Sequence, residues 1–308
     1  MNNATKGILF ALLATLLWSG NMVVASGIKG HIPPVGSAFW RWTVACIVLA
    51  PFALKSTIND FKIIRTHFAY LALTAIMGIT VFNTLIYFAG KTTSAVNLSL
   101  IAISIPLFIV VLSRIIFKEE VSNIKITGIA IIITGVLVLI SKGSFQALLQ
   151  INFAIGDVLM ILACLFFAFY TILVRKKPDE LSPKVFLFSV FVIGTILLFP
   201  FYFIENLYFK KVYFDIKTIL VVSYVGICAS LISFYFWNEA IRFIGTSKTA
   251  MIYYLIPVFS GVLAYIFLNQ AIALTQVISM GIIIVGLLIT NKNSGRIKKN
   301  FSLKDKLL

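Results

Sequence analysis

The chain has 308 residues, of which 60% are hydrophobic and only 12% are charged. A soluble domain is closer to half apolar and one quarter charged, so this chain has too few polar residues to cover a globule in water. The composition therefore predicts an integral membrane protein. The formal charge of +16 does not indicate nucleic-acid binding, because the basic residues lie in short gaps between apolar runs, where such residues set membrane orientation.

Ten apolar runs are long enough to cross a membrane as helices, for which roughly 20 residues are needed. They cover residues 7–28, 35–54, 68–88, 94–117, 123–141, 154–174, 185–204, 217–239, 246–268 and 272–290. The first run follows Lys6 and resembles a signal peptide, but its length favours an uncleaved helix. We therefore predict an all-α membrane protein with ten transmembrane helices.

The distribution of Lys and Arg predicts the orientation of these helices. With the N-terminus inside, 19 of the 26 basic residues lie in inner segments, six lie in outer segments, and Arg41 lies within a span. This bias places both termini in the cytoplasm, including a basic tail over 292–308. Because the chain is rich in Ile, Phe, Lys and Asn, as expected from an AT-rich bacterial genome, the predicted location is a bacterial cytoplasmic (inner) membrane.

Two halves of the chain resemble each other at a constant offset of 151 positions. This offset relates Ala89 to Ala240, Pro106 to Pro257 and Gly135 to Gly286. Such self-similarity indicates a duplicated unit. Each unit has an odd number of spans, so the second must enter the membrane from the opposite side, as in many secondary transporters. We predict two inverted five-helix repeats, over 1–142 and 154–291.

Polar and aromatic side chains inside the spans are the candidate site residues, because a polar group in a membrane needs a partner or water. Those that share helix faces with one another, or precede a proline, are candidates for a substrate cavity. They are Trp18, Asn21, Arg41, Asn83, Tyr87, Asn97, Ser104, Tyr170, Ser230, Ser233, Trp237, Tyr253 and Tyr254. Helix packing is the alternative role for each polar residue. Trp40 and Trp42 are expected at the membrane–water interface instead.

Two charged residues inside the spans have two possible roles each. Arg41 lies where a cation costs about 2.5–3.5 kcal/mol, so it either binds an anion such as a substrate carboxylate, or extends outward or pairs with backbone carbonyls. Glu239 is a candidate for carrying a coupling proton, but pairing with Arg242, three residues later, is favoured.

Pro106 and Pro257 each remove a helix hydrogen bond at equivalent points of the two halves. Matching helix breaks of this kind indicate a transport site, although a simple packing kink is the alternative. No phosphate-binding loop, dinucleotide fingerprint or metal-ligand spacing occurs in the sequence, so we expect no cofactor, no metal and no enzymatic activity.

The sequence resembles the EamA family of ten-helix carriers, in the drug/metabolite transporter superfamily. The first half carries LLWSGNMVVA, FWRWTVA and FKEEVSNIKITGIAIIITGVLV, and the second carries GDVLMILACLFFAFYTILVRK and FWNEAIRFIGTSKTAMIYYLIPVF. The resemblance covers residues 5–291. The chain departs from the family pattern at two positions. Phe167 stands where the family frequently has tryptophan, and the second half has Gln270 at the position equivalent to Glu119 of the first half.

This resemblance implies a central cavity lined by spans 1–4 and 6–9, alternating access, and small metabolites as substrates, often amino acids. We therefore expect a secondary transporter of amino acids or related compounds, surrounded by membrane lipids, with a proton as the candidate coupling ion. Three alternatives remain open at this point: efflux of lipophilic cations, flipping of a lipid carrier, and a non-transporting membrane subunit. Substrate identity, direction and oligomeric state are not predicted.

Overall fold

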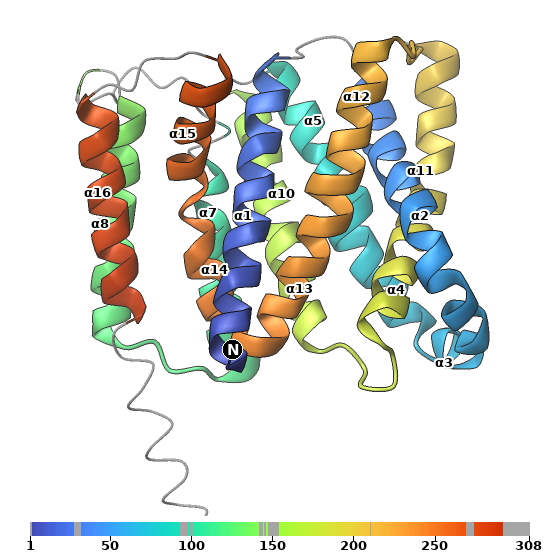
Figure 1. The fold of residues 1–308 in the computed structure, drawn as a ribbon, viewed down its shortest axis with the longest axis horizontal. Helices are drawn as coiled ribbons and strands as arrows, with labels where there is room; N and C mark the ends of the chain where they lie inside the picture. Colours follow the sequence, from blue (N-terminus) through green and yellow to red (C-terminus); the bar gives the residue numbers. More distant parts are fainter. Residues whose placement is uncertain are drawn as a thin grey trace, which may run out of the picture.

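The structure is a computed structural model of the chain, and it describes residues 2–27, 32–92, 98, 101–141, 144, 146, 154–209, 211–268 and 274–291. In these residues the regular secondary structure is entirely helical. The described helices run roughly parallel to one another and form one elongated bundle (Figure 1). Five helical stretches in the described part are long and apolar enough to cross a membrane: Pro34–Asn59, Phe68–Thr92, Ile155–Arg175, Pro183–Tyr208 and Ile216–Ile244.

The helices follow the predicted apolar runs in both halves. In the first half they are α1 (Asn3–Gly27), α2 (Pro34–Asn59), α3 (Phe61–Thr66), α4 (Phe68–Ala75), η1 (Ile76–Val81), α5 (Phe82–Thr92), α7 (Ser104–Phe117) and α8 (Asn123–Ser141). In the second half they are α10 (Ile155–Arg175), α11 (Pro183–Tyr208), α12 (Ile216–Tyr224), η2 (Val225–Ile232), α13 (Ser233–Ile244), α14 (Thr246–Tyr253), α15 (Ile256–Leu268) and α16 (Leu274–Asn291).

Equivalent prolines begin the second long helix of each half. Pro34 opens α2 and Pro183 opens α11, in the first turn, where a missing N–H costs nothing. The free N–H groups of α11 are capped by Ser182, whose hydroxyl accepts from Val185 at 3.4 Å. Those of α2 are capped from the other half of the chain by Glu205.

A wide π-helical turn interrupts the third long helix of each half, at η1 and at η2. Such turns leave carbonyl groups without their usual i+4 partners, and they are frequent at functional sites. Local side chains take up these carbonyls. Asn83 Nδ2 donates to Gly78 O at 3.1 Å, Ser230 Oγ to Val225 O at 2.8 Å, and Ser233 Oγ to Cys228 O at 2.7 Å.

The helical path is also broken at the two points predicted from the prolines. A turn at residue 103 precedes α7, and a turn over 254–255 separates α14 from α15. Pro106 and Pro257 therefore lie in the first turn of a new helix rather than in a kinked continuous one. The two breaks are related by the offset of 151, so both halves share this feature.

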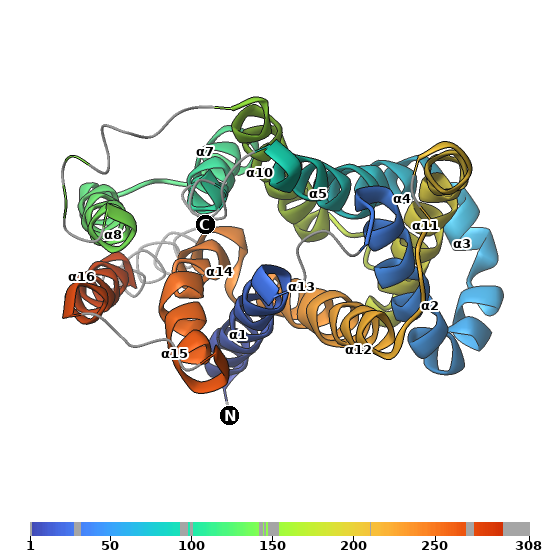
Figure 2. The same cartoon turned by 90° about the horizontal axis from the view of Figure 1, so that it is seen from above.

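Helix packing follows the duplication. The helix α8 packs along α16 at one edge of the bundle, and α2 packs along α11 at the other edge (Figure 2). Between them, α1 packs against α13 and α15, while α10 packs against α5 and α7. Exchanging the two halves maps this set of pairs onto itself, as expected if the halves have the same fold.

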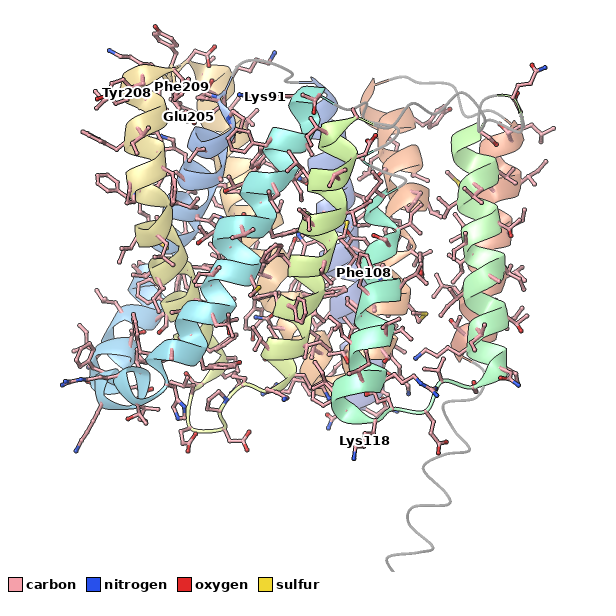
Figure 3. All side chains as sticks on the ribbon, turned by 180° about the vertical axis from the view of Figure 1, so that it is seen from behind. Lys91, Phe108, Lys118, Glu205, Tyr208 and Phe209 are labelled. Atoms are coloured by element: carbon pink, nitrogen blue, oxygen red, sulfur yellow. The ribbon has the colours of Figure 1, made fainter. Side chains whose placement is uncertain are left out.

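The helices α8 and α16 approach closely because both carry glycine at the contact. A Cβ atom at Gly128 would lie 2.9 Å from the carbonyl oxygen of Gly286, and one at Gly286 would lie 2.9 Å from that of Gly128. Membrane helices associate through small residues of this kind. Large apolar side chains are exposed around the bundle, for example Ile115, Ile196 and Leu220, as expected for a surface in contact with lipid. Tyr208 and Phe209 are exposed in the same way at the end of α11 (Figure 3).

Candidate functional site

Arg41 connects α2 to the π-helical turn η2 in the interior of the bundle. Its Nε donates to Ser230 Oγ at 2.8 Å, one terminal nitrogen donates to Tyr87 OH at 3.1 Å, and the other lies 3.4 Å from Ala229 O. The side chain is buried, with 5% of its surface exposed. Three predicted site residues, far apart in the sequence, therefore meet at one guanidinium group.

The partners of Arg41 are all neutral. The ion pairs found in the described part of the chain involve other residues, and no carboxylate there pairs with Arg41. A guanidinium has five N–H donors, and three of them are engaged. One donor on each terminal nitrogen has no partner among the described residues, and a guanidinium can bind a carboxylate through two such donors. Outward extension of Arg41 is wrong, because the guanidinium is bonded inward. The predicted pairing with a backbone carbonyl is found, at Ala229 O.

Trp18 binds the same backbone carbonyl as Arg41. Its Nε1 donates to Ala229 O at 2.9 Å. Its ring contacts four other aromatic rings, with centroid distances from 5.2 to 5.9 Å. With Tyr170, which stacks on Phe167, these rings form a buried cluster that we call the aromatic core: Trp18, Phe167, Tyr170, Phe234, Trp237 and Tyr253. Arg41 is thus linked to the aromatic core through one peptide group of η2.

Trp42 belongs to the interior, and the prediction of an interfacial position for it was wrong. Its ring is fully buried, and it lies 4.7 Å from Phe191 and 5.0 Å from Phe234 between centroids. Trp40 is half-buried and lies 4.9 Å from Phe214. Residues two positions apart in a helix point about 200° apart, so Trp42 faces the interior of the bundle and Trp40 points to nearly the opposite side of α2.

Other predicted residues serve their own helices. The amide of Asn83 and the hydroxyl of Ser233 bind backbone carbonyls of η1 and η2, as described above, so both have a structural role in this structure.

Asn21 is half-buried on α1, Ser104 is the first residue of α7, and the buried hydroxyl of Tyr254 lacks a partner among the described residues. Asn97 lies outside the described residues. Glu239 forms the predicted ion pair with Arg242.

A second polar network joins the two halves at the end of the bundle that carries the N-terminus and Lys118 (Figures 1 and 3). Glu119, which follows α7, pairs with Arg175 at the end of α10 and accepts from Ser247 of α14 at 2.5 Å. Burial alone would raise the pKa of Glu119, but hydrogen bonds from Ser247 and Arg175 and the positive charge of Arg175 lower it overall.

Sequence reasoning missed two acidic residues that cap helices. Asp157 accepts from the N–H of Ala154 at 2.6 Å at the start of α10. Glu205 is buried near the end of α11, five residues beyond Pro200. Its two oxygens accept from the N–H groups of Val35 at 3.2 Å and Gly36 at 2.7 Å. A charged residue directly after an apolar run was the available signal for Glu205. Its partner in the other half was not visible in the sequence.

Comparisons with known proteins agree with this architecture. The EamA-like transporter family model matches residues 5–141 and again residues 154–292. The uncharacterized transporter YyaM of Bacillus subtilis is 27% identical over 265 residues, covering 84% of this chain and 85% of its own length. An uncharacterized transporter of Archaeoglobus fulgidus is 26% identical over 271 residues, covering 88% and 91%.

A solved structure titled "Crystal structure of protein" has a TM-score of 0.78 at 19% identity and covers 95% of this chain and 99% of its own. At this identity the likeness concerns the fold alone. The two matches of the family model correspond to the two halves described above, and together they cover most of the chain. The chain therefore belongs to the EamA-like transporter family and is a helical membrane transporter.

Proposed function

We propose that the protein is a secondary transporter of small organic metabolites that carry a carboxylate group, with amino acids as the first candidates. The observation that supports this substrate class is Arg41, a buried cation with neutral partners, two of whose donors have no partner in the described part of the chain. A cation inside a membrane is costly unless an opposite charge approaches it. A substrate carboxylate would supply that charge and accept both free hydrogen bonds.

The surroundings of Arg41 fit an amino acid. Tyr87, which binds the guanidinium, is only half-buried, so this side of the group is the accessible one. The aromatic core contacts the same peptide group through Trp18, so an apolar or aromatic side chain of the substrate would pack against it. The same positive charge would repel a lipophilic cation, which makes efflux of such cations the less favoured alternative.

We further propose that the chain crosses the membrane ten times, as two inverted repeats that expose a central site alternately to each side. The matching helix breaks at residues 103 and 254–255 support this topology. The helix packing also supports it, because exchanging the two halves maps the packed pairs described above onto one another. The excess of Lys and Arg in the predicted inner segments favours termini in the cytoplasm.

Counterflow into proteoliposomes tests the proposal. Vesicles are preloaded with one unlabelled amino acid at a time, and exchange for the labelled compound is measured. Arg41→Gln should reduce exchange about 10- to 100-fold, because it removes charge-assisted hydrogen bonds worth about 1.5–3 kcal/mol. Arg41→Lys keeps the charge without the fork and should be intermediate. Arg65→Gln, on an exposed arginine of α3, is the matched control and should exchange like the wild type.

The outcomes separate the competing functions. Exchange of carboxylates that survives in a folded Arg41→Gln variant would refute the role of Arg41. Exchange of a lipophilic cation, with none of carboxylates, would favour drug efflux. No exchange of any solute by wild-type protein would contradict solute transport and favour a lipid flippase or a non-transporting subunit. Monodispersity in size-exclusion chromatography shows whether each variant is folded.

A further inference from the structure

A cavity of about 490 Å³ lies where α10 ends and α11 begins. This is the end of the bundle at which the N-terminus lies (Figure 1). The cavity is enclosed by the end of α10, the loop over 176–182, the start of α11 and the end of α13. Its volume lies in the range of small-molecule sites, about 300–1,000 Å³. Polar and charged side chains line much of it, among them Lys177, Asp179, Ser182, Asn238, Glu239 and Arg242. We call this cavity the α10–α13 pocket.

Asn238 carries an unused donor just behind the wall of the pocket. Its carbonyl oxygen accepts a hydrogen bond from Tyr170 OH at 2.9 Å, but its Nδ2 is buried and has no partner in the part of the chain that the structure describes. A buried donor without an acceptor costs about 1–3 kcal/mol, so such groups are usually satisfied by water or a ligand. If the amide turned toward the pocket, it would donate to a carboxylate oxygen there.

The pocket offers charges of both signs. Arg242 and Glu239 form an ion pair on one wall. On the opposite loop, Lys177 donates to the carbonyl oxygens of Pro178 at 2.9 Å and Leu181 at 2.6 Å, which fixes the loop and leaves Asp179 at the rim. Arg242 and Asn238 can donate to a carboxylate, and Glu239 and Asp179 can accept from an ammonium group. A small molecule that carries both groups matches this set.

The pocket is separated from the aromatic core by one hydrogen-bonded pair. Asn238 lines the pocket, whereas its partner Tyr170 is fully buried and packs on Phe167 and Phe234, with centroids 5.7 and 5.4 Å away. Next to Asn238 in the chain, Trp237 belongs to the core and donates to Thr171 at 3.2 Å. A solute in the pocket would therefore lie directly behind the Tyr170–Asn238 pair.

We propose that the α10–α13 pocket binds a small zwitterion, with its carboxylate on Asn238 and Arg242 and its ammonium group on Glu239 and Asp179. The pocket is a second binding position for the transported solute, apart from Arg41, and the Tyr170–Asn238 pair closes the path between the pocket and the aromatic core. This inference rests on the proposed function for the identity of the solute, but the binding can be measured without transport.

Protection of an introduced cysteine tests the occupancy of the pocket. Ser182 lines the pocket and Lys184, two residues later, is exposed and does not line it. The rate at which a fluorescent maleimide labels Ser182→Cys is measured in purified full-length protein, with a mixture of neutral L-amino acids, the corresponding amines, or the corresponding carboxylic acids added. Lys184→Cys is the control for reactivity, and the wild-type protein is the control for the native cysteines.

Amino acids should slow the labelling of Ser182→Cys and leave Lys184→Cys unchanged. The amines and the carboxylic acids should each need at least about tenfold higher concentration, because each lacks one of the two charged groups and the hydrogen bonds that this group would make. In the same assay, Asn238→Leu removes the amide donor at nearly constant size, together with the oxygen that accepts from Tyr170. It should raise the amino-acid concentration for half protection about tenfold. Equilibrium dialysis of labelled amino acid against the wild type and Asn238→Leu gives the same comparison without any cysteine.

Unchanged labelling with all three mixtures, equal protection by the singly charged compounds, or wild-type affinity in Asn238→Leu would each overturn the inference. Counterflow of amino acids combined with no protection would refute binding in this pocket and leave the transport proposal standing. Protection combined with no counterflow of any solute would support the pocket as a binding site and refute the transport proposal.

Discussion

The ion pair between Glu119 and Arg175 should contribute measurably to the stability of the folded bundle. It joins the end of α7 in the first half to the end of α10 in the second, and Ser247 of α14 adds a hydrogen bond to the same carboxylate. The Arg175 guanidinium also lies 4.0 Å from the ring centroid of Phe117, which holds the side chain in place. We therefore predict an energetic coupling between the two residues across the halves.

The magnitude follows from the exposure of the two side chains, which is 28% for Glu119 and 33% for Arg175. An exposed pair contributes about 0–1 kcal/mol, and removing one partner of a fully buried pair costs about 3–5 kcal/mol. A half-buried pair with additional hydrogen bonds should lie between these limits, near 2 kcal/mol. This coupling corresponds to a factor of about 30 in the equilibrium between folded and unfolded protein.

A double-mutant cycle measures this coupling. The free energy of unfolding in mixed detergent micelles is determined for the wild type, Glu119→Gln, Arg175→Gln and the double variant. The pH dependence gives a second check. Because the pKa of Glu119 is lower in the folded protein, its contribution is fully present above the ordinary glutamate pKa of about 4.3. The contribution is lost as the pH falls from that value through the lower value of the folded state.

A coupling below about 0.5 kcal/mol at neutral pH would refute the reasoning, since the pair would then behave as one fully screened by water. A coupling that persists unchanged at a pH where the carboxylate is protonated would also refute it. In that case neutral hydrogen bonds, such as the one from Ser247, would account for the effect. A strong salt dependence at neutral pH would assign the pair to the exposed class.

Two further substitutions test the packing of the halves. Gly78→Ala should destabilise the protein by about 1–3 kcal/mol, because its Cβ would lie 2.2 Å from the Tyr170 ring. The control Gly90→Ala, whose Cβ would have nothing closer than 3.8 Å, should be neutral or slightly stabilising, and unfolding titrations compare the two variants. Glu205→Gln should cost about 1–2 kcal/mol in the same titration, because the amide keeps one acceptor oxygen for two N–H groups of α2 and loses the favourable charge at the helix N-terminus; an unchanged free energy would refute the capping role.

The sequence by itself determined the helical elements and the duplication. Continuous apolar runs can satisfy their backbone groups in a membrane only as helices, so the runs over 35–54 and 185–204 became α2 and α11. The matching of Pro106 with Pro257 placed the two helix breaks, because proline acts on its own helix and needs no partner. Arg41 was recognisable as unusual for the same reason, since the cost of a buried cation is a property of a single residue.

Only the tertiary structure decided which partners these residues have. Helical periodicity predicts which residues share a face, but not which helix that face meets. Arg41 meets Ser230, 189 positions away, and Glu205 caps a helix that begins 171 positions earlier. Asn83 shares a face with candidate site residues and still binds its own backbone, because the π-helical turn frees a carbonyl within its reach. Contacts between distant segments depend on the packing of whole helices, which local sequence patterns do not encode.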